Sequence, residues 1–161
     1  MTPLEKLLAI EEIRQLKARY FRCVDTKDWD GFAAVFTGDV VLDRTYSGTI
    51  RNPWTGEWNP PLAQAPVRVH GRDAVLAVIR DVVENLQTVH HGHMPEIAFV
   101  DARNATGIWA MEDELRDRQD RLILIGKGHY HETYHMTDDG WRIASFRLTR
   151  LSIRRGDATR D

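Results

Sequence analysis

The sequence predicts an α+β domain in which helices pack on one face of a curved antiparallel or mixed β-sheet. Before residue 87, apolar residues recur every three or four positions, as they do on one face of a helix. After residue 87 they alternate with polar residues through four long segments, as they do in half-buried strands. Helices followed by a run of strands are typical of the α+β class. A chain of 161 residues is long enough for one domain with a real core, so we expect a single domain over residues 1–161 with a charged tail from about residue 154.

Three helices are predicted in the first half of the chain. Thr2-Pro3-Leu4-Glu5 has the form of a capping box with proline at the first helical position. The apolar stripe that follows predicts a helix to about Asp25, and its members are Leu4, Leu7, Leu8, Ile13, Leu16, Tyr20, Cys23 and Val24. Asp28 can cap a second, short helix through Phe36, with Thr37-Gly38-Asp39 ending it. Residues 73–86 place six aliphatic side chains on one face and predict the third helix.

The predicted strands are two short ones and four long ones. Residues 40–46 and 67–70 read as short strands, and residues 88–100, 105–116, 121–137 and 141–153 as long ones separated by polar turns. Residues 47–66 show no period and hold four of the six prolines together with Trp54 and Trp58. A long connection of this kind is usually a functional lid or an interface arm, so we expect Trp54 or Trp58 to close a cavity mouth, in the same chain or in a neighbouring subunit.

Composition narrows the functional classes. A formal net charge of −2 gives no reason to expect nucleic acid as a partner. The single cysteine, Cys23, excludes an intrachain disulfide and suits a reducing compartment. We see no basic region followed by an apolar run at the start and no apolar stretch near 18 residues, so we expect a cytoplasmic protein without a membrane partner.

Four side chains suggest acid/base chemistry. Tyr20 and Asp25 lie five residues apart near the end of the first predicted helix and leave neighbouring parts of that helix end. A phenol can donate a proton, and a carboxylate can orient a histidine or stabilise its charged form. His90 and a second acid, Asp113, come from the first two long strands. The sequence alone leaves open whether Asp25 or Asp113 pairs with His90.

Strand alternation predicts which side chains line a cavity. Asp113 shares a face with Trp109 and Met111, and burying an acid there is costly unless it is paired. Arg150 ends an apolar stripe that includes Phe146, so it either reaches solvent or holds an anion. A curved sheet wrapped on helices leaves a mostly apolar pocket with few polar groups. The substrate-lining residues that we expect are Trp29, Trp54, Trp58, Trp109, Met111, Tyr130 and Phe146.

Each candidate also has a structural explanation, and the histidines allow a metal site. Tyr20 could be a core residue, Asp25 a helix-end acid and His90 a surface histidine. His129, His131 and His135 alternate along one face of the third long strand, and two such histidines can chelate a metal. The carboxylates that would complete a site are not clearly placed, and this face looks like the outside of the sheet. We therefore expect neither metal nor cofactor.

Several segments resemble the SnoaL-like family of the NTF2-like superfamily. The similar segments are residues 16–30 around Tyr20 and Asp25, the run His90-x-Gly92-His93-x-Pro95-Glu96-Ile97, the run Trp109-x-x-Glu112-Asp113, and Gly140-Trp141 followed nine residues later by Arg150. They look most like the bile-acid 7-alpha-dehydratase branch and more distantly like scytalone dehydratase and hexachlorocyclohexane dehydrochlorinase. The resemblance runs from about residue 8 to residue 152. Residues 47–66 depart from the pattern, being longer and richer in proline and tryptophan.

The resemblance implies a conical NTF2-like fold and a set of catalytic residues. The matching positions are Tyr20, Asp25, His90, Asp113 and Arg150. It implies a cofactor-independent lyase of the dehydratase kind, or an isomerase, for a hydrophobic polycyclic or aromatic molecule such as a steroid or polyketide. His90 would be the base, an acid would hold its tautomer, and Tyr20 would donate a proton. The alternatives are a non-catalytic binding or assembly module, as in dioxygenase β-subunits, and a polyketide cyclase.

We predict that the chain forms a homo-oligomer, a homotrimer by the resemblance, with a homodimer as the alternative. Long strands with aromatic and histidine-rich outer faces need covering, and residues 47–66 could reach a neighbour. Sedimentation at micromolar concentration should give a species larger than one chain. A monomer under those conditions would contradict the prediction.

Overall fold

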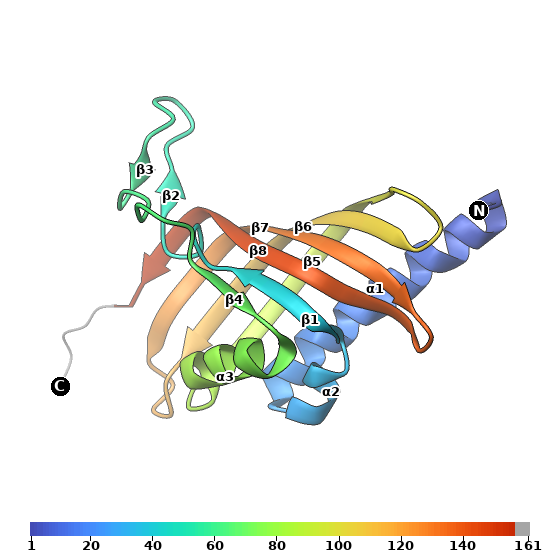
Figure 1. The fold of residues 1–161 in the computed structure, drawn as a ribbon. Coiled ribbons are helices and arrows are strands. Elements are labelled where there is room, and N and C mark those ends of the chain that lie inside the picture. Colours follow the sequence, from blue (N-terminus) through green and yellow to red (C-terminus); the bar gives the residue numbers. More distant parts are fainter. Residues whose placement is uncertain (157–161) are drawn as a thin grey trace.

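The fold is α+β, as predicted. A computed structural model describes residues 1–156, and in this part of the chain three helices lie against an eight-stranded mixed sheet (Figure 1). The helices are α1 (Pro3–Thr26), α2 (Trp29–Ala33) and α3 (Arg72–Val83). The short strands are β1 (Phe36–Asp43), β2 (Ile50–Arg51), β3 (Trp58–Asn59) and β4 (Arg68–His70), and the long ones are β5 (Gln87–Phe99), β6 (Asn104–Arg116), β7 (Leu122–Thr137) and β8 (Gly140–Arg155).

Helix α1 begins and ends where its local chemistry dictates. The Thr2 hydroxyl accepts from the Glu5 backbone N–H, and the Glu5 carboxylate accepts from the Thr2 N–H, which is the predicted capping box. The helix ends before Lys27, whose φ of 60° is left-handed. Leu4, Leu7 and Leu8 are exposed rather than buried, because the first turns of α1 extend past the sheet (Figure 1). The members of the predicted stripe are therefore buried only from Ile13 onward.

The second helix is shorter than predicted. Asp28 caps α2 by accepting from the Gly31 N–H, but the helix ends at Ala33. Phe36 starts β1 instead, where it is 1% exposed and pairs with Ile143 of β8. The predicted turn at residues 37–39 lies inside β1, at a register shift between Phe36 and Val41. The sheet contact made by Phe36 thus outweighs the local turn signal.

The long strands follow the prediction closely, with bounds that differ by at most two residues. The sheet order is β3-β2-β8-β7-β6-β5, and β1 pairs in parallel with β8 and antiparallel with β4. Pro95 follows a register shift between β5 and β6, so the strand bulges there, as a proline predicts. Helix α1 covers the face of the sheet that carries most of the buried side chains, including Trp109, Tyr130 and Phe146.

The 47–66 segment contains regular structure that its sequence did not predict. Strands β2 and β3 pair as a small hairpin that projects from the body of the domain (Figure 1). Asn52 closes the loop between them, since its side-chain oxygen accepts from the N–H groups of Trp54 and Thr55. The tail expected from Arg154 begins inside β8, and residues 157–161 lie outside the described part of the chain. Within residues 1–156, no helix is both long and apolar enough to span a membrane.

Candidate functional site

Asp25 and His90 form the centre of the candidate site. Asp25 comes from the last turn of α1 and His90 from the start of β5. Asp25 Oδ1 lies 2.6 Å from His90 Nδ1, and Asp25 Oδ2 accepts from the His90 backbone N–H at 2.9 Å. The His90 ring stacks on Phe21 with an interplanar angle of 13°. Of the two acids left open by the sequence, Asp25 is therefore the one that contacts the histidine.

Thr88 and Lys27 extend this pair into a chain of hydrogen bonds. Lys27 Nζ donates to Thr88 Oγ1 at 2.9 Å, and Thr88 Oγ1 donates to Asp25 Oδ1 at 2.8 Å. Lysine has no acceptor, so the threonine hydrogen must point to Asp25. An ionised Asp25 can only accept, which places a proton on His90 Nδ1 and leaves Nε2 as a free acceptor.

The environment keeps Asp25 ionised. Burial by itself would raise the pKa of Asp25, but hydrogen bonds from the His90 ring, the His90 backbone and Thr88 together hold that pKa below its usual value. A lowered carboxyl pKa stabilises the folded state above the ordinary aspartate pKa of about 3.9, and this stabilisation is lost as the pH falls further. At neutral pH the carboxylate of Asp25 is thus ionised where it faces His90 Nδ1.

Asp113 is paired with Arg150 and not with His90. The two Arg150 nitrogens Nη1 and Nη2 donate to the two Asp113 oxygens at 2.8 and 2.7 Å, and both side chains are buried. Asp113 lies opposite His90 in the β5–β6 register, so the ion pair faces the same side of the sheet as the histidine. Arg150 Nη1 also donates to the Met111 sulfur, at 3.7 Å. A bidentate pair of this kind fixes both charges in position.

Gly126 of β7 makes room for the Asp113–Arg150 pair. It lies between the two side chains, opposite Asp113 in the register. A Cβ added at Gly126 would lie 2.1 Å from Arg150 Nη1 and 2.4 Å from Asp113 Oδ1. This role of Gly126 was not predicted from the sequence, although a glycine inside a strand often marks a close approach.

Two phenols lie against each other beside this pair. The ring centroids of Tyr20 and Tyr130 are 5.8 Å apart, and both residues are buried. Burial has the largest effect on the pKa of Tyr20 and, together with Tyr130 and Glu132, raises it well above its usual value. Burial and the Asp113 carboxylate likewise raise the pKa of Tyr130. Both phenols therefore stay protonated at neutral pH and can donate hydrogen bonds.

A buried ion pair between Lys17 and Glu132 was missed by the sequence analysis. Lys17 is 0% exposed, and its Nζ hydrogen-bonds to Glu132 Oε1. The signal was present, because Lys17 lies four residues after Ile13 and three before Tyr20, on the buried stripe of α1. Glu132 alternates with Tyr130 and Tyr134 on the inner face of β7.

The predicted lining residues do not all lie together. Trp109, Met111, Tyr130 and Phe146 belong to the buried inner face. Trp29 packs on Phe32 and Arg80, between α2 and α3. The remaining two lie on the projecting hairpin: Trp58 packs on Tyr46, whereas Trp54 is 90% exposed.

The tryptophan lid is therefore wrong for Trp54 within one chain. A side chain that is 90% exposed lines no cavity in its own chain, because the hairpin projects away from the body (Figure 1). A role for it across a subunit interface stays a prediction.

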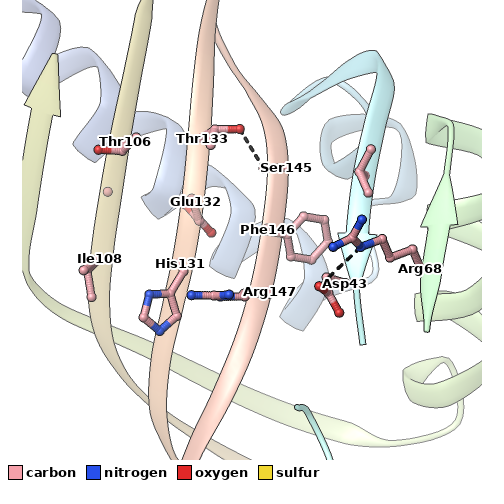
Figure 2. Close-up of a pocket in the computed structure, with 12 residues that line it drawn as sticks. Asp43, Arg68, Thr106, Ile108, His131, Glu132, Thr133, Ser145, Phe146 and Arg147 are labelled. Carbon is pink, nitrogen blue, oxygen red and sulfur yellow. Dashed lines mark hydrogen bonds and ion pairs between the residues drawn. The ribbon is translucent and has the colours of Figure 1, made fainter. Parts of the chain in front are cut away.

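An open groove of about 440 Å³ lies on the opposite face of the sheet. Figure 2 shows it with α1 behind the strands, lined by His131, Arg147 and the Asp43–Arg68 ion pair. His131 accordingly lies on the outer face, and burial followed by Arg147 lowers its pKa. Within residues 1–156, no three His, Cys, Asp or Glu side chains group in a way that could hold a metal ion. The groove contains no member of the Asp25–His90 pair.

We predict that Gly126→Ala destabilises the protein by about 1–3 kcal/mol, the usual cost of overpacking. The added methyl group would push Arg150 and Asp113 apart. Urea unfolding measures the change. Gly38→Ala is the matched control, since a Cβ there meets no atom within 4 Å. Equal stability of the two variants would contradict this reading of Gly126.

Comparisons with known proteins agree with this fold. The chain is 25% identical over 154 residues to the probable cyclase FGR4 of Gibberella zeae, covering 86% of this chain and 89% of that one. The fold is similar to a type 2 hexachlorocyclohexane dehydrochlorinase, with a TM-score of 0.75, 16% identity and coverage of 99% and 97%. It is also similar to a protein provisionally assigned as a scytalone dehydratase in Novosphingobium aromaticivorans, with a TM-score of 0.74, 18% identity and 98% coverage of both chains.

The family is shown by a match to the model of the SnoaL-like domain, which spans residues 5–147. The particular resemblance to bile-acid 7-alpha-dehydratase stays a prediction. The chain, with its Asp–His pair between helix and sheet, its buried phenols and its curved mixed sheet, therefore belongs to the SnoaL-like family.

Proposed function

We propose that this protein is a cofactor-independent acid/base enzyme, a lyase of the dehydratase kind or an isomerase, acting on a hydrophobic polycyclic or aromatic small molecule. The observation that carries the proposal is the Asp25–His90 contact of 2.6 Å, whose histidine shares the neighbour Phe21 with two buried, protonated phenols. A base and an acid are thereby available in one site without any cofactor.

His90 is the general base in this proposal. Because Asp25 holds the proton on Nδ1, Nε2 can take a proton from a substrate carbon next to a carbonyl group. Asp25 then stabilises the imidazolium through its ionised carboxylate. Thr88 and Lys27 hold Asp25 in place and are positioning residues.

Tyr20 is the proton donor. Its phenol is protonated at neutral pH and can donate to a substrate carbonyl oxygen or to a leaving hydroxyl group, and its raised pKa favours rapid return of a proton to the phenolate. In a dehydration, His90 takes the carbon proton, the C–O bond breaks, and the hydroxyl leaves as water with the Tyr20 proton. The imidazolium then returns a proton to the phenolate, which restores the site. In an isomerisation the proton returns to a different carbon and no bond to oxygen breaks.

Asp113 and Arg150 have another role. Since they neutralise one another, neither is free to hold the His90 tautomer. Their bidentate contact instead places a fixed dipole near the phenols. An anionic substrate group would have to compete with Asp113 for Arg150.

A cyclase is the second candidate, favoured by the 25% identity with the probable cyclase FGR4. The same base could form a carbanion that attacks a second carbonyl group of a polyketide-like chain. A third candidate is a binding or assembly module without turnover.

We also propose that the chain forms a homo-oligomer. In it, the outer face of the sheet, with His131, Arg147 and the half-exposed Ile108, would be covered by other copies of the chain.

A panel of substrates tests the proposal. It contains scytalone, hexachlorocyclohexane and a general probe for a base in an apolar site, 5-nitrobenzisoxazole. With the probe, the base takes the ring C–H proton, the N–O bond breaks, and a coloured nitrophenolate forms whose oxygen can accept from Tyr20. Turnover of any panel member above the rate with free imidazole supports an enzyme. Tight binding without turnover would favour the binding module.

We predict that His90→Ala lowers kcat for the best panel substrate by about 10²–10⁴-fold, the usual contribution of a general base. The fold should persist, since the backbone N–H of residue 90 and the Thr88 hydroxyl still donate to Asp25, and backbone bonds hold β5 against β6. His91→Ala is the control, because His91 is exposed and faces the other side of β5. A His90→Ala variant with the wild-type rate would show that the base has been assigned wrongly.

We predict that Tyr20→Phe lowers the rate while the melting temperature changes little. Only a hydroxyl group is lost, worth about 0.5–1.5 kcal/mol of stability as a net hydrogen bond. The ring keeps its contacts with Phe32 and Phe36. Steady-state kinetics and thermal unfolding measure the two effects. An unchanged rate with a large loss of stability would make Tyr20 a structural residue.

A further inference from the structure

A buried cation lies beneath the two phenols, and nothing in the proposed mechanism uses it. Lys17 Nζ lies 3.9 Å from the centroid of the Tyr20 ring, 3.7 Å from that of Tyr130 and 4.7 Å from that of Phe21. A cation within about 6 Å of a ring face is attracted to it, and the attraction is larger when the cation is desolvated. Lys17 therefore stands in a cage of three aromatic faces.

Glu132 holds this cation through a chain of hydrogen bonds that starts in the sheet. Trp109 Nε1 donates to the Tyr134 hydroxyl at 2.7 Å, and that hydroxyl donates to Glu132 Oε2 at 2.6 Å. Gly107 leaves room for the chain, since a Cβ there would lie 2.9 Å from the Tyr134 oxygen. The other oxygen of Glu132 accepts from Lys17. The cage thus ties β6 and β7 to the middle of α1.

Stability alone gives a weak reason for such a pair. Both charges lose water on burial, and apolar residues of similar size in place of a buried ion pair are often neutral or stabilising. Burial lowers the pKa of Lys17, while Glu132 opposes that shift and favours the charged form. What the pair provides is a charge at a fixed point between the two phenol rings.

We propose that Lys17 and Glu132 are positioning residues that fix Tyr20 and Tyr130, so that their hydroxyl groups point at the substrate beside His90. The hydroxyl of a tyrosine lies on the long axis of its ring, so clamping the face of the ring decides where the proton is offered. Tyr20 is also bordered by Phe32, Phe36 and Phe146. These contacts surround the ring with apolar groups, and the Lys17 charge adds an attraction to the ring face. The role of Tyr20 as donor rests on the function proposed above, whereas the clamping of the rings does not.

The double variant Lys17→Met/Glu132→Gln tests the proposal, because it removes both charges together and keeps the side-chain lengths. The chain supplies a matched control in Lys127→Met/Glu112→Gln, since Lys127 and Glu112 form an exposed ion pair at 3.3 Å between β7 and β6. Circular dichroism and thermal unfolding establish that both variants fold. With 5-nitrobenzisoxazole, the buried variant should lose about 10- to 100-fold in kcat with little change in KM, as expected for a displaced reacting group. The control should keep the wild-type values.

Tyrosine NMR gives a readout that does not need activity. The four tyrosines can be labelled at the ring carbons and assigned by single Tyr→Phe variants. In the buried variant, the signals of Tyr20 and Tyr130 should shift and broaden while that of Tyr46 stays in place. In the wild type, Lys17 should be a charged ammonium at pH 7 whose side-chain signals are shifted by the rings around it.

The outcomes separate the two proposals. If the wild type turns over no panel substrate, the proposed function fails, and the NMR data alone decide the clamping. A folded buried variant with wild-type kinetics and unchanged tyrosine signals would overturn the clamping, as would an uncharged Lys17 at pH 7. If the buried variant does not fold, the Lys17 signals in the wild type decide: an ammonium shifted by the rings supports the cage, and its absence overturns it.

Discussion

The carboxylate of Asp25 ties the end of α1 to the start of β5, and the rest of the candidate site is arranged around this contact. Its two oxygens accept from the His90 ring, the His90 backbone and Thr88. The left-handed residue Lys27 ends the helix there and reaches back to the Val24 carbonyl and to Thr88. One carboxylate therefore closes the helix–sheet contact and sets the direction of the histidine. Stability and chemistry depend on the same bonds.

The interior around the phenols contains charges, but the charges come in pairs. Asp113 is matched with Arg150 and Glu132 with Lys17, and each partner comes from a different element. Gly126 provides the space that Arg150 and Asp113 need, and Gly107 makes room for Tyr134, which hydrogen-bonds to Glu132. An interior built this way holds fixed dipoles near the phenols, and in the proposed mechanism the Asp25–His90 pair is the reactive group. Such preorganised groups stabilise developing charge without having to reorganise.

The sequence predicted the parts of the fold that depend on local pattern. The capping box at Thr2 and the alternation of the four long strands were confirmed, because short-range chemistry decides them. The predicted end of α2 was wrong because Phe36 pairs with a strand far along the chain, β8. The β2–β3 hairpin was missed because its strands are only two residues long and carry no period.

The sequence predicted which residues form the candidate site, but only some of the contacts between them. His90 pairs with Asp25 rather than Asp113 because Arg150, from a strand far along the chain, forms an ion pair with Asp113. Lys17 lies on the buried stripe, but a lysine there is ordinarily taken for a residue that reaches solvent. The burial of Lys17 is possible only because Glu132 on β7 accepts a hydrogen bond from it. The alternation along each strand predicted which side chains share a face of the sheet. Which charged side chains pair across strands depends on the strand register, which the sequence does not show.

The chemistry of the site depends on the tautomer of His90, and nitrogen NMR of the histidine side chains measures this tautomer directly. With the protein labelled at the ring nitrogens and His90 assigned from His90→Ala, we expect a neutral ring with its proton on Nδ1 and a bare Nε2 at a pH above the histidine titration. Asp25→Asn should weaken this preference, because the acceptor that holds the proton is lost. A wild-type spectrum with the proton on Nε2, or one that Asp25→Asn leaves unchanged, would show that Asp25 does not set the tautomer of His90.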